Sequence, residues 1–306
     1  MDTTDQQLVP AMVTEWFPLV PRPRPPGRPL AERVAEVREL ARSAEHGETG
    51  LASAAEAHNK AALIASDCGL ADLARRLCWR QFDVFEAAAP LSATAAKYAL
   101  QPVVNLGRLL TRSGHGDRAY QVYGNAYHAV TTATAASIEG RNIDFGPIVD
   151  QANHRRELTK FLWTVLLADG TRALTRAGRW DEALRCLEQH KGVGHRMLDG
   201  RQVAILARYA AGNSDHALAL LDDSATPEPW EQAVAAYLRA LCLRGTGRPA
   251  GVAVDAMINH YRQLDHTPGH AIFRSRLGLC VLAQRPPRGS DTADRRCDRP
   301  RGGACR

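Results

Sequence analysis

The sequence is short of aromatic residues and of long apolar runs, and both shortages exclude classes of protein. Aromatic residues make up only 6% of the 306 residues. Alanine therefore does much of the packing, which suits helices in close contact. No apolar run reaches the roughly 18 residues that a membrane span requires, and the N-terminus lacks the order of charges and apolar residues of a secretory signal. We expect a cytoplasmic protein without a membrane-spanning segment.

Catalytic and metal-binding motifs are also missing. The seven cysteines include no Cys-x-x-Cys pair, so we expect neither a metal site nor a cofactor. The sequence has no phosphate-binding loop of the Gly-x-x-x-x-Gly-Lys-Ser/Thr type, no Gly-x-Ser-x-Gly and no His-Glu-x-x-His. Gly114-x-Gly116-x-x-Ala119 matches a dinucleotide fingerprint. It follows a predicted helix instead of a strand, which indicates a turn.

Lysine is scarce, because only four of the 39 basic residues are lysine. An arginine-rich and alanine-rich composition is typical of a high-GC genome, such as an actinobacterial one. The net charge is +6, but residues 285–306 alone carry +4. The rest of the chain therefore lacks the basic footprint of a nucleic-acid-binding domain, and we do not expect a nucleic-acid partner.

Strand signals are weak, whereas helical patterning runs from about residue 29 to residue 284. There is no Asn-Gly turn, and neither Asp-Gly pair has the alternating flanks of a hairpin. The patterns predict an all-α fold. The expected helices are 29–45, 49–68, 71–88, 93–113, 116–138, 152–177, 180–190, 196–211, 214–222, 228–244, 250–263 and 268–284.

One spacing occurs four times: a glycine, an alanine five residues later and an apolar residue four beyond that. The four copies are Gly69/Ala74/Cys78, Gly114/Ala119/Tyr123, Gly178/Ala183/Leu187 and Gly212/Ala217/Leu221. Gly212 follows Gly178 by 34 residues, and Gly245 follows Gly212 by 33. A period near 34 with a glycine at each helix end predicts an array of helical repeats.

The repeat resembles the tetratricopeptide family. The clearest unit is 104–126, which has Leu106-Gly107-x-x-Leu110 followed by Gly114, Ala119, Tyr123 and Ala126. The unit at Gly178 keeps the turn and the second helix but has Gly170-Thr171 in place of Leu-Gly. The resemblance implies a right-handed superhelical array of antiparallel helix hairpins, an α-solenoid, over about 50–284. It is most similar to the repeat regions of actinobacterial regulators.

Three regions are expected along the chain. Residues 1–29 form a proline-rich N-terminal arm, residues 30–284 form the repeat domain with an interrupting loop at 139–151, and residues 285–306 form a disordered tail. The arm has two interpretations. It is either a loose extension or a strap whose Trp16 and Phe17 dock on the helical body or on a second subunit of a homodimer.

The resemblance also implies a binding surface, because the first helix of each hairpin lines a concave groove in this family. The matching positions are Asn59, Lys60, Asn105, Arg108, Arg112, Arg172, Arg176 and Gln202. Arginine and amide side chains in one strip suit an extended peptide with acidic side chains or a free carboxylate. The alternative is that these are ordinary solvated side chains.

Two functions remain open. The first is a non-enzymatic repeat protein that binds a peptide or protein partner, as an adaptor, a regulator or an accessory factor in a biosynthetic pathway such as secondary metabolism. The second is an α-helical enzyme or enzyme subunit acting on a peptide or small metabolite. Its site would lie near 139–157, with His154, Arg155 and Glu157 as candidate catalytic residues.

Overall fold

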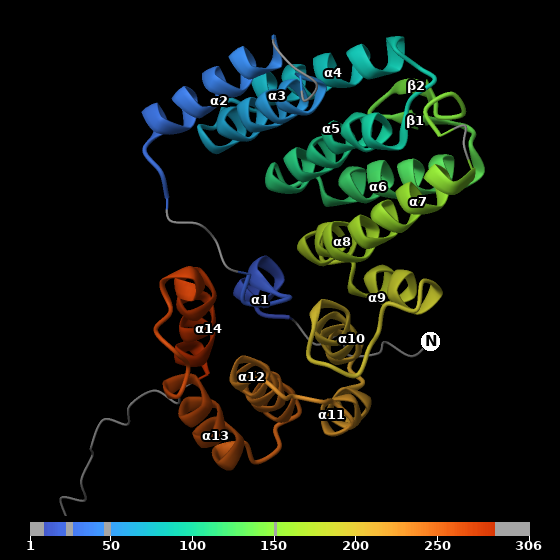
Figure 1. Cartoon of the computed structure of the whole chain (residues 1–306). Coiled ribbons are helices and arrows are strands. Elements are labelled where there is room, and N and C mark those ends of the chain that lie inside the picture. The colour runs from blue at the N-terminus through green and yellow to red at the C-terminus, as the bar shows by residue number, and fades with distance from the viewer. Residues whose placement is uncertain (1–8, 23–26, 46–49, 150–151, 285–306) are drawn as a thin grey trace, which may run out of the picture.

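The computed structural model describes residues 9–22, 27–45, 50–149 and 152–284 (Figure 1). Helices predominate in these residues, and their one sheet is a two-stranded hairpin. The elements in chain order are α1 (Ala11–Trp16), α2 (Leu30–Ala44), α3 (Gly50–Asp67), α4 (Ala71–Ala87), α5 (Ala93–Arg112), α6 (Gly116–Thr132), β1 (Ala135–Ile138), β2 (Arg141–Asp144), α7 (Ala152–Val165), the π-helical turn η1 (Leu166–Gly170), α8 (Thr171–Arg176), α9 (Trp180–Gln189), α10 (Asp199–Ala210), α11 (Ser214–Asp222), α12 (Pro229–Gly245), α13 (Gly251–Arg262), the short 3-10 helix η2 (Pro268–His270) and α14 (Ala271–Ala283).

Consecutive helices pack in pairs, and the pairs stack into an array. Each of α3 and α4, α5 and α6, α10 and α11, and α12 and α13 forms a contacting pair. The first helices of successive pairs also contact each other. These contacts join α3 to α5, α10 to α12, and α12 to α14. The array curves, so that α14 returns toward the middle of the chain and α1 lies on the inner side (Figure 1). The predicted array of helical repeats is therefore confirmed.

The glycines predicted to end helices do so in four cases. Gly69, Gly114, Gly178 and Gly212 have φ between +73° and +81°, a conformation that only glycine adopts without strain. The fifth helix-ending glycine was predicted to be Gly245, and this prediction is wrong. Gly245 is the last residue of α12, and the left-handed residue is Gly247, 35 residues after Gly212.

Close helix contact explains the Leu-Gly signature of the clearest repeat unit. Gly107 on α5 faces the ring of Tyr123 on α6, and a Cβ at Gly107 would overlap that ring. Tyr123 is only 2% exposed. The same arrangement recurs at the end of the array, where Gly278 of α14 faces Tyr261 of α13. Glycine at this position thus lets a tyrosine of the neighbouring helix pack directly on the backbone.

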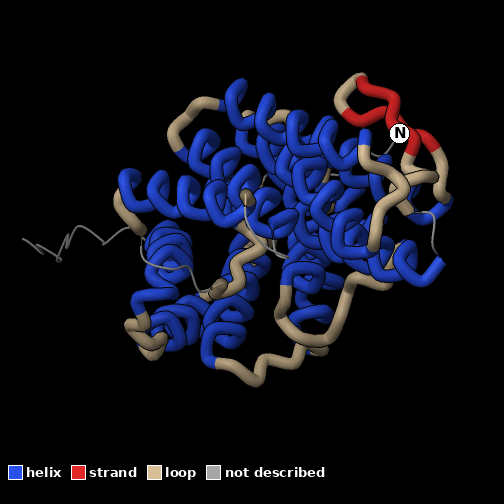
Figure 2. The backbone as a smooth tube through the Cα atoms, turned by 45° about the horizontal axis from the view of Figure 1, so that its top comes forward, coloured by secondary structure: helices blue, strands red, loops and turns tan. Residues whose placement is uncertain are grey.

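The predicted helix 116–138 is wrong beyond Thr132. Ala133 has φ +53°, and the chain then forms the antiparallel hairpin of β1 and β2, in which Ile138 pairs with Arg141. Figure 2 shows the hairpin projecting at one edge of the helical body. Ile138 and Ile143 are both buried. Burial of these two side chains against α6 outweighs the helical preference of the alanine-rich run before them.

The tip of the hairpin carries a buried carboxylate. Glu139 has φ +49°, and its side chain is 2% exposed. One of its oxygens lies 3.0 Å from Arg75 of α4 and 3.9 Å from Arg118 of α6. Burial raises the pKa of this carboxyl against the opposing effect of the two arginines. The predicted loop 139–151 is therefore part strand, and residues 150–151 lie outside the described residues.

Two further expectations concern the membrane and the tail. Among the described residues, no helix has both the length and the apolar character needed to cross a bilayer. The predicted tail, 285–306, lies outside the described residues.

A half-buried histidine gives the N-terminal half a testable response to acid. Burial, and secondarily the charge of Arg80, lower the pKa of His58 on α3. Its Nδ1 is buried and has no hydrogen-bond partner among the described residues. Because the folded-state pKa lies below the unfolded one, the unfolded chain binds the proton first as the pH falls. Stability is therefore lost as the pH drops below about 6.5, the unperturbed pKa of histidine.

We expect His58→Gln to reduce this acid sensitivity. The measurement is the urea midpoint at pH 7.5 and pH 5.5 for the wild type, for His58→Gln and for His128→Gln, which replaces an exposed histidine on α6. The difference between the two pH values should shrink in His58→Gln and stay unchanged in His128→Gln. An equal pH response in all three proteins would show that His58 does not cause the effect.

Candidate functional site

The inner side of the array holds the chain's own N-terminal segment. Here "the N-terminal segment" means residues 9–22, which include α1. Val13 and Phe17 are fully buried, and Leu19 is 3% exposed. All three belong to one apolar cluster with residues of α10, α11, α12, α13 and α14. The arm is therefore a strap that docks on the helical body and not a loose extension.

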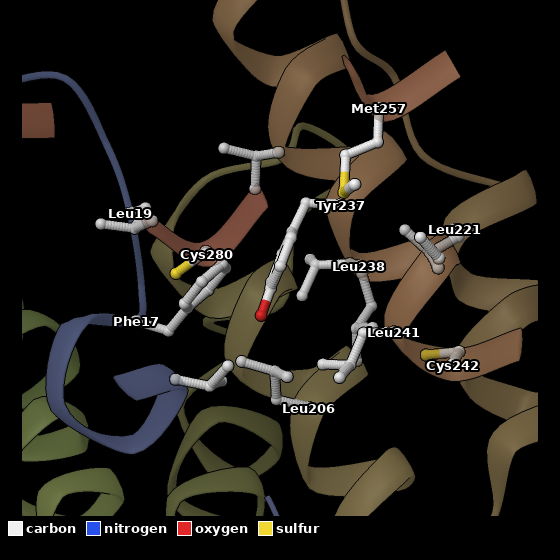
Figure 3. Close-up of a cluster of buried hydrophobic side chains, with 14 of the residues drawn as sticks. Phe17, Leu19, Leu206, Leu221, Tyr237, Leu238, Leu241, Cys242, Met257 and Cys280 are labelled. Atoms are coloured by element: carbon white, nitrogen blue, oxygen red, sulfur yellow. The ribbon is translucent and has the colours of Figure 1, made fainter. Parts of the chain in front are cut away.

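Phe17 is the main anchor of this segment. Its ring stacks on Tyr237 of α12 with the ring centroids 5.4 Å apart and the planes at 25°. Figure 3 shows Phe17 entering the apolar cluster beside Tyr237 and Cys280, above Leu206. Trp16, its neighbour, is only half-buried at the edge of the same cluster.

Two of the predicted groove residues hold the main chain of the segment. Gln202 on α10 accepts a hydrogen bond from the Leu19 amide at 2.7 Å and donates one to the Leu19 carbonyl at 2.9 Å. Arg172 on α8 donates to the Pro18 carbonyl at 3.0 Å. The Gln202 side chain is fully buried, so it acts on Leu19 as a neighbouring β-strand would.

Charges surround this contact. Burial, with smaller effects from Arg22 and Arg276, lowers the pKa of Arg172, and the carboxylate of Asp199 opposes the shift. Arg22 at the end of the segment makes a two-pronged contact of 2.9 Å with Asp199 at the start of α10. The segment is thus held by an apolar anchor, by its main chain and by an exposed ion pair.

In the N-terminal half of the array, the predicted side chains contact one another or nearby acids. Asn105 donates to Asn59 at 2.6 Å, and its own buried Oδ1 has no partner among the described residues. Lys60 pairs with Glu36 and Glu56.

The arginines of this half are also paired. Arg108 lies 2.8 Å from Asp169, and Arg112 lies 3.2 Å from Asp67. Asp169 belongs to η1, a π-helical turn of a kind often found at functional sites. Arg176 differs, because it is exposed and makes no ion pair with another described residue.

Of the eight predicted residues, the structure brings two pairs together, Asn59 with Asn105 and Arg172 with Gln202. Arg172 and Gln202 meet at the N-terminal segment, and Asp169 connects Arg108 electrostatically with Arg172. Most of the predicted positive charge is balanced by carboxylates, among them Glu36, Asp67 and Asp169. Asp199 and Tyr237 are site residues that sequence reasoning missed.

The alternative catalytic residues lie on the first turns of α7. His154 and Arg155 are half-buried, and Glu157 is exposed. Arg155 donates to the carbonyl of Val149 at 3.5 Å and so connects α7 to the preceding loop. An enzymatic site here remains a prediction that the structure does not test.

Comparison with known proteins identifies the class of repeat. Residues 171–199 match the family model of the tetratricopeptide repeat. The match covers α8, α9 and the start of α10, so it falls on the unit at Gly178 and not on the unit predicted to be clearest, 104–126. The chain is a helical-repeat protein that contains a tetratricopeptide motif. No curated protein and no solved structure matches the chain significantly.

Proposed function

We propose that this protein is a non-enzymatic scaffold that binds an extended segment of a protein partner along the inner side of its helical array. It acts in this proposal as an adaptor, a regulator or an accessory factor in a biosynthetic pathway. One observation carries it: Gln202 and Arg172, from two successive units, both hold the main chain of the non-helical stretch that follows α1. Main-chain hydrogen bonds of this kind supply affinity for a bound peptide, and the side-chain positions beside them supply its specificity.

Charge gives the proposal a second support. Arg176 is a cation of the matched repeat unit without a carboxylate partner among the described residues, so acidic side chains or a terminal carboxylate of the partner would pair with it. Such pairing weakens as salt screens the charges.

The test is capture of partners from a lysate of the source organism, read by mass spectrometry. We expect Arg108→Ala/Arg172→Ala/Arg176→Ala to lose a partner that the wild type retains, and capture by the wild type to weaken at high salt. A matched control removes three exposed arginines from second helices, Arg76→Ala/Arg185→Ala/Arg262→Ala, and should retain the partner. Equal capture by the groove variant and the control would contradict the proposal.

A further inference from the structure

The N-terminal segment contacts the body of the protein as a separate ligand would. Its main-chain hydrogen bonds join residues 154 and 183 positions apart in the sequence. The next helix, α2, packs on α3 at the opposite end of the array, whereas α1 contacts α8 and α14 (Figure 1). Residues 23–29 are therefore the stretch of chain, here called the tether, that joins the docked segment to α2 at the opposite end of the array.

The contact also has the composition of a binding interface. A protein interface has a buried apolar centre, often with an aromatic anchor, and a polar rim. Here Phe17 and Val13 are the fully buried centre, and the exposed pair of Arg22 and Asp199 is the rim. The helix α1 has only six residues, which is too short to be stable without the surface on which it lies.

A tethered occupant competes with any free ligand for the same site. Because the tether makes this competition intramolecular, the strength of the competition depends on an effective concentration that is set by the length and stiffness of the tether. A partner segment must therefore displace residues 9–22 before it binds, and its apparent affinity falls in proportion to the fraction of sites that are open.

We propose that the surface of α8, α10, α12 and α14 is a recognition site for one class of partner segment, and that residues 9–22 are its built-in competitor. In chain order, the recognised segment has an apolar residue, three residues of any type, the sequence Phe-Pro-Leu, two residues of any type, and an arginine or lysine. The apolar residue and the phenylalanine take the places of Val13 and Phe17, and the basic residue reaches Asp199. This inference rests on the proposed function and names the chemistry of the partner.

The experiment opens the tether without altering the site. A protease recognition sequence is inserted between Gly27 and Arg28, which are both exposed, and the purified full chain is cleaved there. The probe is a fluorescein-labelled synthetic peptide of residues 9–22. We expect no binding to the uncleaved chain and micromolar binding after cleavage, measured by fluorescence anisotropy. The matched control peptide carries Phe17→Ala and should bind at least about tenfold more weakly, since aromatic anchors dominate such interfaces.

A second protein checks the same site without cleavage. Phe17→Ala in the full, uncleaved chain weakens the competitor, so the labelled peptide should now bind it. Gln202→Ala added to this variant should abolish that binding, because it removes the main-chain contacts to Leu19.

Two outcomes would overturn the inference. One is a cleaved chain that holds its fragment against a large excess of peptide, and the other is a chain that unfolds when the fragment leaves. Either result would make residues 9–22 a fixed part of the core. If lysate capture still depends on Arg108, Arg172 and Arg176 in that case, the proposed function stands and only the inference about the partner's chemistry fails.

Discussion

Replacing Phe17 by alanine should lower the free energy of unfolding by about 3–5 kcal/mol, the range measured for large aromatic residues removed from protein cores. Phe17 is fully buried and stacks on Tyr237. The substitution leaves a cavity between α10, α12 and α14, and it removes the anchor that keeps the N-terminal segment in place. Denaturation in urea, followed by circular dichroism, measures the loss.

Trp16→Ala is the matched control for this prediction. Trp16 is the neighbouring and larger side chain, yet it is only half-buried at the edge of the cluster. Its removal should cost clearly less than the removal of Phe17. If the two variants lose equal stability, or if Trp16→Ala loses more, the buried stack on Tyr237 is not the main contact of the segment.

The helices and turns could be predicted because their signals are local. Glycines at φ near +75° end four helices, and each is followed by the alanine that the neighbouring helix requires for close packing. Apart from the hairpin, the outer bounds of the predicted helices agree with the structure to within three residues, but α1 was not predicted, and the single predicted helix 152–177 is divided into α7, η1 and α8. The hairpin was missed because the residues before Ile138 are mostly alanine and threonine, whose strand conformation depends on burial of Ile138 and Ile143.

The candidate site could be predicted only in part. The family resemblance placed Arg172 and Gln202 on the inner side, where the structure has them. The sequence left open whether the N-terminal arm is loose or docks on these residues, because the contacts that hold it join residues more than 150 positions apart. The carboxylates that balance the arginines, Asp67 and Asp169, come from neighbouring units. Their positions depend on how the units stack, which no local pattern records.

Gln202→Leu should be the most informative change at the site, because it keeps the size of the side chain and removes its hydrogen bonds. Gln202 is fully buried and contacts the amide and carbonyl of Leu19 and the carbonyl of Met197, the last at 2.8 Å. The substitution leaves three main-chain groups without their partner. A buried polar group left unpaired costs about 1–3 kcal/mol, so we expect a total loss of about 3 kcal/mol after partial relaxation.

Hydrogen exchange distinguishes loss of this contact from a general loss of stability. In the wild type the Leu19 amide donates to Gln202, so it should exchange slowly. In Gln202→Leu it should exchange far faster, while amides of α5 and α6 in the other half keep their wild-type rates. Gln121→Leu, at an exposed position of α6, is the matched control and should change neither quantity. A Leu19 amide that stays protected in Gln202→Leu would mean that the apolar contacts of Phe17 alone hold the segment, and that Gln202 does not recognise its main chain.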